Sequence, residues 1–216
     1  MAAPLQLTFV MSARSLTDLP PTSAEIAFVG RSNVGKSSLV NSLANRRQLA
    51  RVSNTPGRTQ SLNLFSLREG GTIVDLPGYG YAAVPTREKA TWAPMIERYL
   101  LQREGLRALL VLVDGEIGPT PLDLQMLDWV RANAITTLVV ATKADKVKPS
   151  RLAGRKQQVA AASRLHEGDI TWVSAAKGTG STRCATGCAP CSADGSVSDV
   201  ATPCAPWRRG HAGRAG

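Results

Sequence analysis

The chain has 216 residues, of which 43% are hydrophobic, and it carries a formal net charge of +10. This length suits one domain with a sizeable core, and no apolar run approaches the roughly 18 residues of a membrane-spanning helix. No positive charge precedes the first apolar stretch, which argues against a secretory signal and predicts a cytoplasmic protein. The basic balance favours an acidic partner, most often nucleic acid; the alternative is a solvated charge excess with no partner.

Strand-like and helix-like segments alternate between residues 24 and 174. The predicted elements in chain order are strand 26–29, helix 37–44, loop 46–60, strands 62–67 and 72–75, helix 85–102, strand 109–113, helix 121–131, strand 137–141, helix 150–165 and strand 170–173. This alternation predicts an α/β fold with a mostly parallel sheet of six strands and helices on both faces. Ligands of such folds bind beyond the carboxyl ends of the strands.

A phosphate-binding loop follows the first predicted strand. Residues 30–38 match G-x-x-x-x-G-K-[ST] without a mismatch, between an apolar strand and a helix start. Glycines let backbone N–H groups turn toward an anion, and the helix N-terminus adds further donors. Lys36 supplies a charge for the β- and γ-phosphates, and the Ser37 hydroxyl is a ligand for Mg²⁺. The predicted phosphate-binding residues are Gly30, Arg31, Ser32, Asn33, Val34, Gly35, Lys36, Ser37 and Ser38.

Asp75, Leu76, Pro77 and Gly78 form a D-x-x-G motif at the end of the third predicted strand. An aspartate in that place can hold Mg²⁺ through water, and the glycine N–H can meet a γ-phosphate. The motif by itself is weak evidence, because an ordinary exit from a strand into a turn has the same sequence. Its position at the end of an apolar strand makes it a nucleotide-binding candidate.

Two further motifs predict guanine as the base. Thr142, Lys143, Ala144 and Asp145 follow strand 137–141, and the Asp145 carboxylate can accept hydrogen bonds from the guanine N1–H and 2-amino groups. Adenine offers no such pair of donors, so this aspartate would select the base. The Lys143 stem can lie over the purine ring. Backbone N–H groups after the last strand can bind the guanine O6, which makes candidates of Val173, Ser174 and Ala175.

Three of these motifs and a turn-rich segment at residues 55–60 together resemble one family. Residues 30–38, 55–60, 75–81 and 142–146 are similar to the motifs of the EngB/YihA/YsxC family of bacterial GTPases, and the resemblance covers about residues 7–180. It implies a Ras-like P-loop GTPase domain that hydrolyses GTP with Mg²⁺. It also implies a role in assembling the large (50S) ribosomal subunit, with a link to cell division and septation. The implied partners are large-subunit precursors and rRNA, with no membrane, and we expect a monomer.

By the same resemblance, Thr59 is the switch threonine that joins Ser37 on Mg²⁺. Its loop is rich in turn residues, as is typical of segments that order around a γ-phosphate and relax after hydrolysis. The plain alternative is a surface turn. The nucleotide-binding residues implied in this loop are Gly57, Arg58, Thr59, Gln60 and Ser61.

The position after Gly78 holds Tyr79, where many GTPases have a glutamine that orients water. We therefore expect slow intrinsic hydrolysis that needs help, and K⁺ is one candidate. Asn33 is its candidate ligand, because related GTPases with this asparagine use K⁺; the alternative is a residue that only stabilises the turn. The candidate catalytic residues are Lys36, Thr59 and Asn33.

Basic residues gather near the switch loop. These residues are Arg46, Arg47, Arg51 and Arg58. One interpretation is that they contact RNA phosphates, and the other is that they form a solvated face. Trp92, Trp129 and Trp172 are better explained as packing residues than as platforms for bases. A second hypothesis for the whole chain is a nucleotide-gated RNA-binding or ribosome-binding module with negligible turnover.

The organisation predicted is an N-terminal extension (1–22), a GTPase domain (23–180) and a low-complexity tail (181–216). The tail lacks Leu, Ile, Met and Phe, so the last helix of a Ras-like domain would be missing or replaced, as after a change of reading frame. All four cysteines of the chain lie there: Cys184, Cys188, Cys191 and Cys204. Their spacing lacks a second C-x-x-C pair, which disfavours a zinc site.

Overall fold

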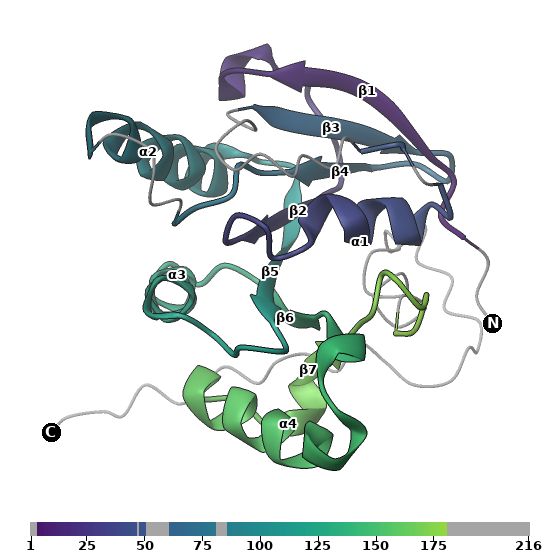
Figure 1. Cartoon of the computed structure of the whole chain (residues 1–216). Coiled ribbons are helices and arrows are strands. Elements are labelled where there is room, and N and C mark those ends of the chain that lie inside the picture. The colour runs from purple at the N-terminus through teal and green to yellow at the C-terminus, as the bar shows by residue number, and fades with distance from the viewer. Residues whose placement is uncertain (1–3, 47, 51–60, 81–85, 181–216) are drawn as a thin grey trace, which may run out of the picture.

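The computed structural model describes residues 4–46, 48–50, 61–80 and 86–180, with the backbone alone for 86–93. A seven-stranded sheet has helices on both of its faces (Figure 1). The elements in chain order are β1 (Leu7–Ala13), η1 (Leu16–Asp18), β2 (Glu25–Gly30), α1 (Lys36–Leu43), β3 (Leu62–Leu67), β4 (Thr72–Asp75), α2 (Thr86–Gln102), β5 (Leu106–Asp114), α3 (Pro121–Ala132), β6 (Thr137–Thr142), η2 (Ala144–Lys146), α4 (Pro149–Ser163), η3 (Glu167–Asp169) and β7 (Ile170–Trp172). Every predicted strand and helix is present, so the α/β fold is confirmed.

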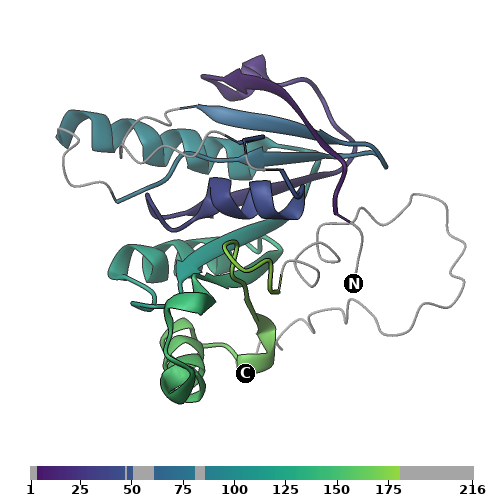
Figure 2. The same cartoon turned by 45° about the vertical axis from the view of Figure 1, so that its right-hand side comes forward.

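The strand order is β1-β3-β4-β2-β5-β6-β7. All neighbours from β4 to β7 are parallel, and the β1–β3 and β3–β4 pairs are antiparallel. Figures 1 and 2 show β1 and β3 at one end of the sheet and β7 with α4 at the other. The parallel strands therefore end at a common edge, where the predicted motifs follow them.

The sheet has seven strands where the sequence suggested six, and the added strand is β1. This strand lies in the segment expected as an N-terminal extension, and it pairs with β3 from Leu7↔Leu67 to Ala13↔Leu62. Phe9 contacts Phe65 edge to face, with ring centroids 5.7 Å apart. The alternation of inward and outward side chains is blurred because the register shifts between Phe9 and Met11, and an edge strand leaves Phe9 exposed. A bulged edge strand thus lacks the regular pattern by which the other strands were predicted.

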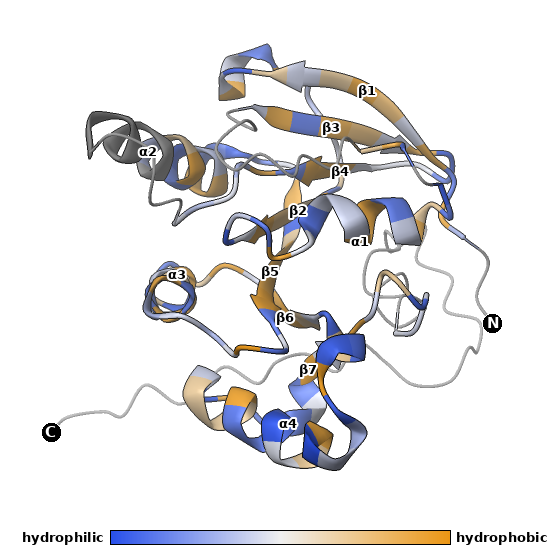
Figure 3. Ribbon diagram, viewed as in Figure 1, coloured by the Kyte–Doolittle hydropathy of each residue, from blue (hydrophilic) through white to orange (hydrophobic). Residues whose placement is uncertain are grey.

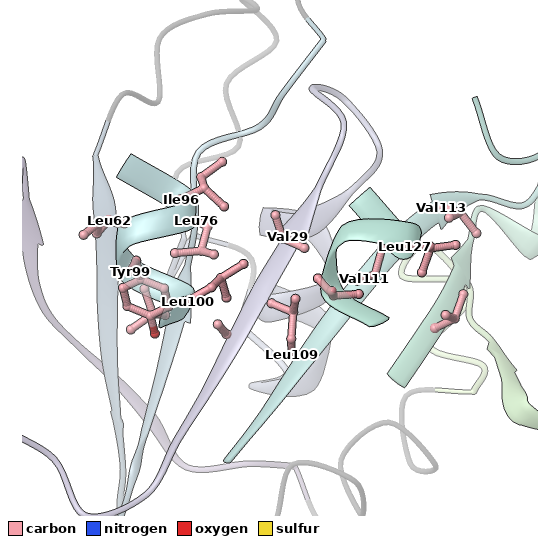
Figure 4. Close-up of a cluster of buried hydrophobic side chains, with 14 of the residues drawn as sticks. Val29, Leu62, Leu76, Ile96, Tyr99, Leu100, Leu109, Val111, Val113 and Leu127 are labelled. Carbon is pink, nitrogen blue, oxygen red and sulfur yellow. The ribbon is translucent and has the colours of Figure 1, made fainter. Parts of the chain in front are cut away.

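Two apolar clusters cover the two faces of the sheet. Alternate residues of the same strands enter different clusters, as Val29 and Phe28 do in β2. The larger cluster packs α2, α3 and α4 against the sheet, and Figure 4 shows part of it, including Val111 and Leu127. The smaller cluster packs α1 against the other face. Figure 3 shows that the central strands are apolar. Their sequences are almost continuously hydrophobic because both faces of these strands are buried.

Helix α3 begins where its sequence signals predict. Thr120 and Asp123 form a capping box, in which the Asp123 carboxylate accepts the Thr120 N–H at 2.7 Å. Pro121 occupies the first turn, where a missing N–H costs nothing.

None of the helices in the described part of the chain has the length and hydrophobicity that a bilayer span requires. The expected tail, 181–216, its four cysteines and the replaced last helix all lie outside the described residues.

Candidate nucleotide-binding site

The phosphate loop has the backbone geometry that an anion site needs. Asn33 and Gly35 adopt left-handed conformations with φ of 63° and 104°, so successive N–H groups turn toward the concave side of the loop. Gly35 directly precedes α1, which starts at Lys36. A side chain at Gly30 would come within 2.7 Å of the Leu112 carbonyl oxygen, which explains the requirement for glycine there. The predicted phosphate cradle is therefore present as backbone geometry.

Neighbouring strands hold this loop in place from two sides. The Ser32 N–H donates to the Tyr79 carbonyl at 2.9 Å, which ties the loop to the residue after the D-x-x-G motif. The Thr142 hydroxyl donates to the Val34 carbonyl at 2.6 Å and to the Val113 carbonyl at 3.1 Å. Because Thr142 ends β6, the motif predicted to bind the base supports the phosphate loop directly.

Lys36 folds back over its own loop. Its Nζ donates to the Gly30 carbonyl at 3.5 Å, a long hydrogen bond that a stronger acceptor would displace. Burial lowers the pKa of Lys36, and the nearby Asp75 carboxylate partly opposes this shift. Phosphate oxygens would favour the charged form further, because they bring negative charge to a poorly solvated ammonium.

Two of the residues expected around Mg²⁺, Ser37 and Asp75, fit that ion, and the third, Thr59, lies outside the described residues. The Ser37 hydroxyl lies 3.1 Å from Oδ2 of Asp75, which is only 1% exposed. The other oxygen of Asp75, Oδ1, is buried and has no hydrogen-bond partner among the described residues. Burial raises the pKa of Asp75, while Lys36 and the Ser37 hydroxyl lower it. A buried carboxylate oxygen without a partner, beside a hydroxyl, is the hard oxygen set that Mg²⁺ and its water ligands prefer.

The side chain predicted to select the base, Asp145, is partly exposed, and a hydrogen bond favours its ionised form. The Ser174 hydroxyl donates to Oδ1 of Asp145 at 2.6 Å, and this bond is the main cause of the lowered pKa of Asp145. The Lys177 N–H in turn donates to the Ser174 oxygen at 3.1 Å, and the Ala144 N–H donates to the Val173 carbonyl at 3.1 Å. The two segments predicted to read guanine are thus joined, with Asp145 partly exposed at their junction.

Comparison with known proteins agrees with this geometry. A family model described as 50S ribosome-binding GTPase matches residues 25–143. The probable GTP-binding protein EngB of Citrifermentans bemidjiense is 46% identical over 171 residues, which span 79% of this chain and 80% of that relative. Its counterpart in Tolumonas auensis is 49% identical over 176 residues, spanning 80% of this chain and 82% of the relative. The chain belongs to the EngB family of GTP-binding proteins.

Solved structures show the same fold. A crystal structure of a probable GTP-binding protein EngB has a TM-score of 0.64 and 24% identity, and the match covers 76% of this chain and 95% of that one. The structure of Era in complex with MgGDPNP and nucleotides 1506–1542 of 16S ribosomal RNA has a TM-score of 0.61 and 20% identity, covering 78% of this chain and 56% of Era. At this level of identity the likeness concerns the fold alone.

This EngB-family site contains one carboxylate that the motifs did not predict. Asp114 ends β5, is 3% exposed, and accepts from the Lys143 Nζ at 2.7 Å. The same oxygen lies 3.6 Å from Nη2 of Arg31 in the phosphate loop. Its other oxygen accepts the N–H groups of Glu116 and Ile117. Asp114 therefore joins the phosphate loop to the base-binding motif, and its sequence signal is the one used for Asp75, an aspartate at the end of an apolar strand.

Tyr79 is fastened to α3 through its hydroxyl, while its backbone pairs with the phosphate loop. That hydroxyl donates to Oδ1 of Asp123 at 2.7 Å, and Oδ2 of Asp123 accepts from the Thr120 hydroxyl at 2.7 Å. Burial and the Asp123 carboxylate raise the pKa of Tyr79, so the phenol stays protonated. The position that holds glutamine in many GTPases is therefore occupied here by a side chain committed to helix packing.

Part of the predicted switch loop lies outside the described part of the chain. Gly57, Arg58, Thr59 and Gln60 lie outside the described residues, as do Arg47 and Arg51. Ser61 precedes β3, and its hydroxyl donates to the Asn63 side chain at 3.4 Å. Arg46 is exposed. Trp129 and Trp172 pack against the larger core cluster as expected, and the side chain of Trp92 is not described.

Proposed function

We propose that this chain binds and hydrolyses GTP with Mg²⁺ and acts as a cytoplasmic, monomeric switch in assembly of the large ribosomal subunit, with consequences for cell division and septation. The observation that carries the nucleotide part is the meeting of Lys36, the Ser37–Asp75 pair and the Ser174-anchored Asp145 at one sheet edge. The ribosomal part is supported by the matching family model, described as a 50S ribosome-binding GTPase, and by the net charge of +10.

Lys36 and the phosphate-loop N–H groups would hold the triphosphate, while Asp145 would select guanine. Ser37, the expected Thr59 and, through water, Asp75 would hold Mg²⁺, which would neutralise charge on the phosphates. The Tyr79 hydroxyl is bound to Asp123, so this side chain is not free to orient the attacking water. Intrinsic turnover is therefore expected to be slow.

Co-sedimentation with large-subunit particles tests the switch. We expect the chain to pellet with large-subunit precursors in a non-hydrolysable GTP analogue and to remain in the supernatant with GDP, because a switch binds its partner in one nucleotide state. Equal pelleting in both states, or none in either, would contradict the proposal. Turnover measured with and without the particles separates it from the alternative, an RNA-binding module with negligible hydrolysis in both conditions.

A monovalent cation near Asn33 is the second part of the proposal. Asn33 is exposed in its left-handed conformation, and its side-chain amide has no hydrogen bond among the described residues, so the amide oxygen is available as a ligand. A cation there would add positive charge beside the phosphates. We expect kcat to be about tenfold higher in K⁺ than in Na⁺ at equal ionic strength, which is about 1.4 kcal/mol of barrier. Asn33→Ala should remove the difference, and equal wild-type kcat in both salts would exclude the cation.

A further inference from the structure

The positive charge of the chain is concentrated beside the base-binding motif. Residues 146–166 contain six Lys or Arg and no Asp or Glu, which is more than half of the net charge of +10. This stretch runs from the end of η2 through α4. The basic residues are Lys146, Lys148, Arg151, Arg155, Lys156 and Arg164.

Three of these residues share one side of the helix. Lys148 is the N-cap of α4, and Arg151 and Arg155 follow it at spacings of three and seven, which brings them into one row. Lys148 and Arg151 are exposed, and Arg155 is partly exposed. Val159, Ala160 and Ser163 form the buried side of α4. We call Lys148, Arg151 and Arg155 the basic flank.

The basic flank has no carboxylate to neutralise it. Within the part of the chain that the structure describes, none of its three residues has a carboxylate oxygen within 4.0 Å, although Arg131 and Arg164 both meet Asp128. Arg155 donates instead to the Ile117 carbonyl at 3.5 Å. Lys148 and Arg151 therefore face solvent, and the charge of Arg155, which a neutral carbonyl does not cancel, also remains available to an external anion.

These charges do not serve the stability of the helix. The first turn of α4 contains no acidic residue, and positive side chains there oppose the helix dipole by about 0.3–1 kcal/mol each at low ionic strength. The apolar anchoring of α4 comes from its buried side, through Val159 and Ala160, and the flank adds only the long Arg155–Ile117 hydrogen bond. A role outside the folded chain explains the arrangement better than a role within it.

The flank is continuous with the nucleotide site. After the Ser174 hydrogen bond, Lys146 and Lys177 also lower the pKa of Asp145, so positive charge lies close to the residue predicted to select the base. Lys148 follows Asp145 by three residues and lies just beyond the short helix η2, which contains Asp145. An anionic polymer bound along the flank would thus contact the same loop as the nucleotide.

We propose that Lys148, Arg151 and Arg155 bind RNA phosphates of the assembling large subunit. This inference rests on the proposed function, and it assigns the RNA contact to α4 in place of the arginines near the switch loop. A row of cations that no described carboxylate neutralises, two exposed and one partly exposed, fits the regular negative charges of a nucleic acid backbone.

The test replaces all three residues in the full chain, as K148Q/R151Q/R155Q, and measures binding to protein-free rRNA extracted from large ribosomal subunits. We expect affinity to fall about tenfold or more, and the slope of log K against log salt to become shallower by about 2 to 3, since each phosphate contact contributes about 0.7–0.9. The matched control is R14Q/R68Q/R98Q, which removes the same charge from three exposed arginines elsewhere. K148Q/R151Q leaves the Arg155–Ile117 bond intact, and GDP affinity reports folding in every variant.

Equal losses in the flank and control variants would overturn the proposal, because net charge alone would then explain binding. Unchanged RNA affinity in the flank variant would overturn it as well. If that variant keeps its affinity for protein-free rRNA but no longer sediments with large-subunit particles, the flank binds a protein and not RNA. Failure of the wild-type chain to bind either particles or rRNA would refute the proposed function itself, which is a different outcome.

Discussion

Replacing Asp145 by asparagine is expected to weaken GTP binding by about 100- to 1,000-fold. The carboxylate would accept two hydrogen bonds from guanine, and a hydrogen bond to a charged group contributes about 1.5–3 kcal/mol. Losing both corresponds to two or more factors of ten. Asparagine can still accept the Ser174 hydroxyl, which donates to Asp145 at 2.6 Å, so the loop should keep its shape. Xanthine offers a carbonyl in place of the 2-amino group, so affinity for xanthosine triphosphate should rise.

Titration with fluorescent GTP and xanthosine triphosphate measures both affinities. Asp169→Asn is the matched control. Asp169 is exposed in η3, and its substitution removes the same charge away from the Thr142–Asp145 motif. The control should bind both nucleotides as the wild type does. A variant at Asp145 that retains its preference for GTP would remove this residue from base selection.

Replacing Glu25 by alanine is expected to destabilise the fold by about 3–5 kcal/mol, the range found when one partner of a buried ion pair is removed. Glu25 is 1% exposed and accepts from the Tyr99 hydroxyl at 2.6 Å, from Arg103 Nε at 2.7 Å and from the Thr72 hydroxyl at 2.8 Å. Burial and the Glu25 carboxylate raise the pKa of Tyr99, which keeps its hydroxyl a donor. Alanine would leave the Arg103 charge without its carboxylate and the Tyr99 hydroxyl without its acceptor, while the Thr72 hydroxyl would keep Thr22 and Ala24 as partners.

Urea denaturation measures this change in the free energy of unfolding. Glu69→Ala is the control, because Glu69 is exposed in the turn between β3 and β4 and its loss should cost less than about 0.5 kcal/mol. The double variant Glu25→Leu with Arg103→Met should recover part of the stability, because it leaves no buried charge unpaired. A loss below about 1 kcal/mol in Glu25→Ala would show that water or another acceptor takes the place of the Glu25 carboxylate.

The nucleotide site could be predicted from sequence because its signals are local. The phosphate loop, the D-x-x-G motif and the Thr142–Asp145 motif are each short, and each follows an apolar strand. Once those strands are parallel neighbours, their carboxyl ends share an edge, and the motifs come together without further information. The elements of the α/β fold were predictable for the same reason, since each depends on the periodicity of a few consecutive residues.

The tertiary structure alone decided which distant side chains meet. Asp114 bridges to Lys143 across 29 residues, Tyr79 to Asp123 across 44, and Glu25 to Arg103 across 78. These bonds depend on strand order and helix docking, which local spacing does not specify. The same holds for β1, whose membership of the sheet rests on pairing with β3, more than 45 residues away. Sequence by itself therefore determined the chemistry of the site, because phosphate and base recognition is encoded in contiguous motifs. Folding decided how the site is supported, because buried charges and hydroxyls find partners only once the sheet has assembled.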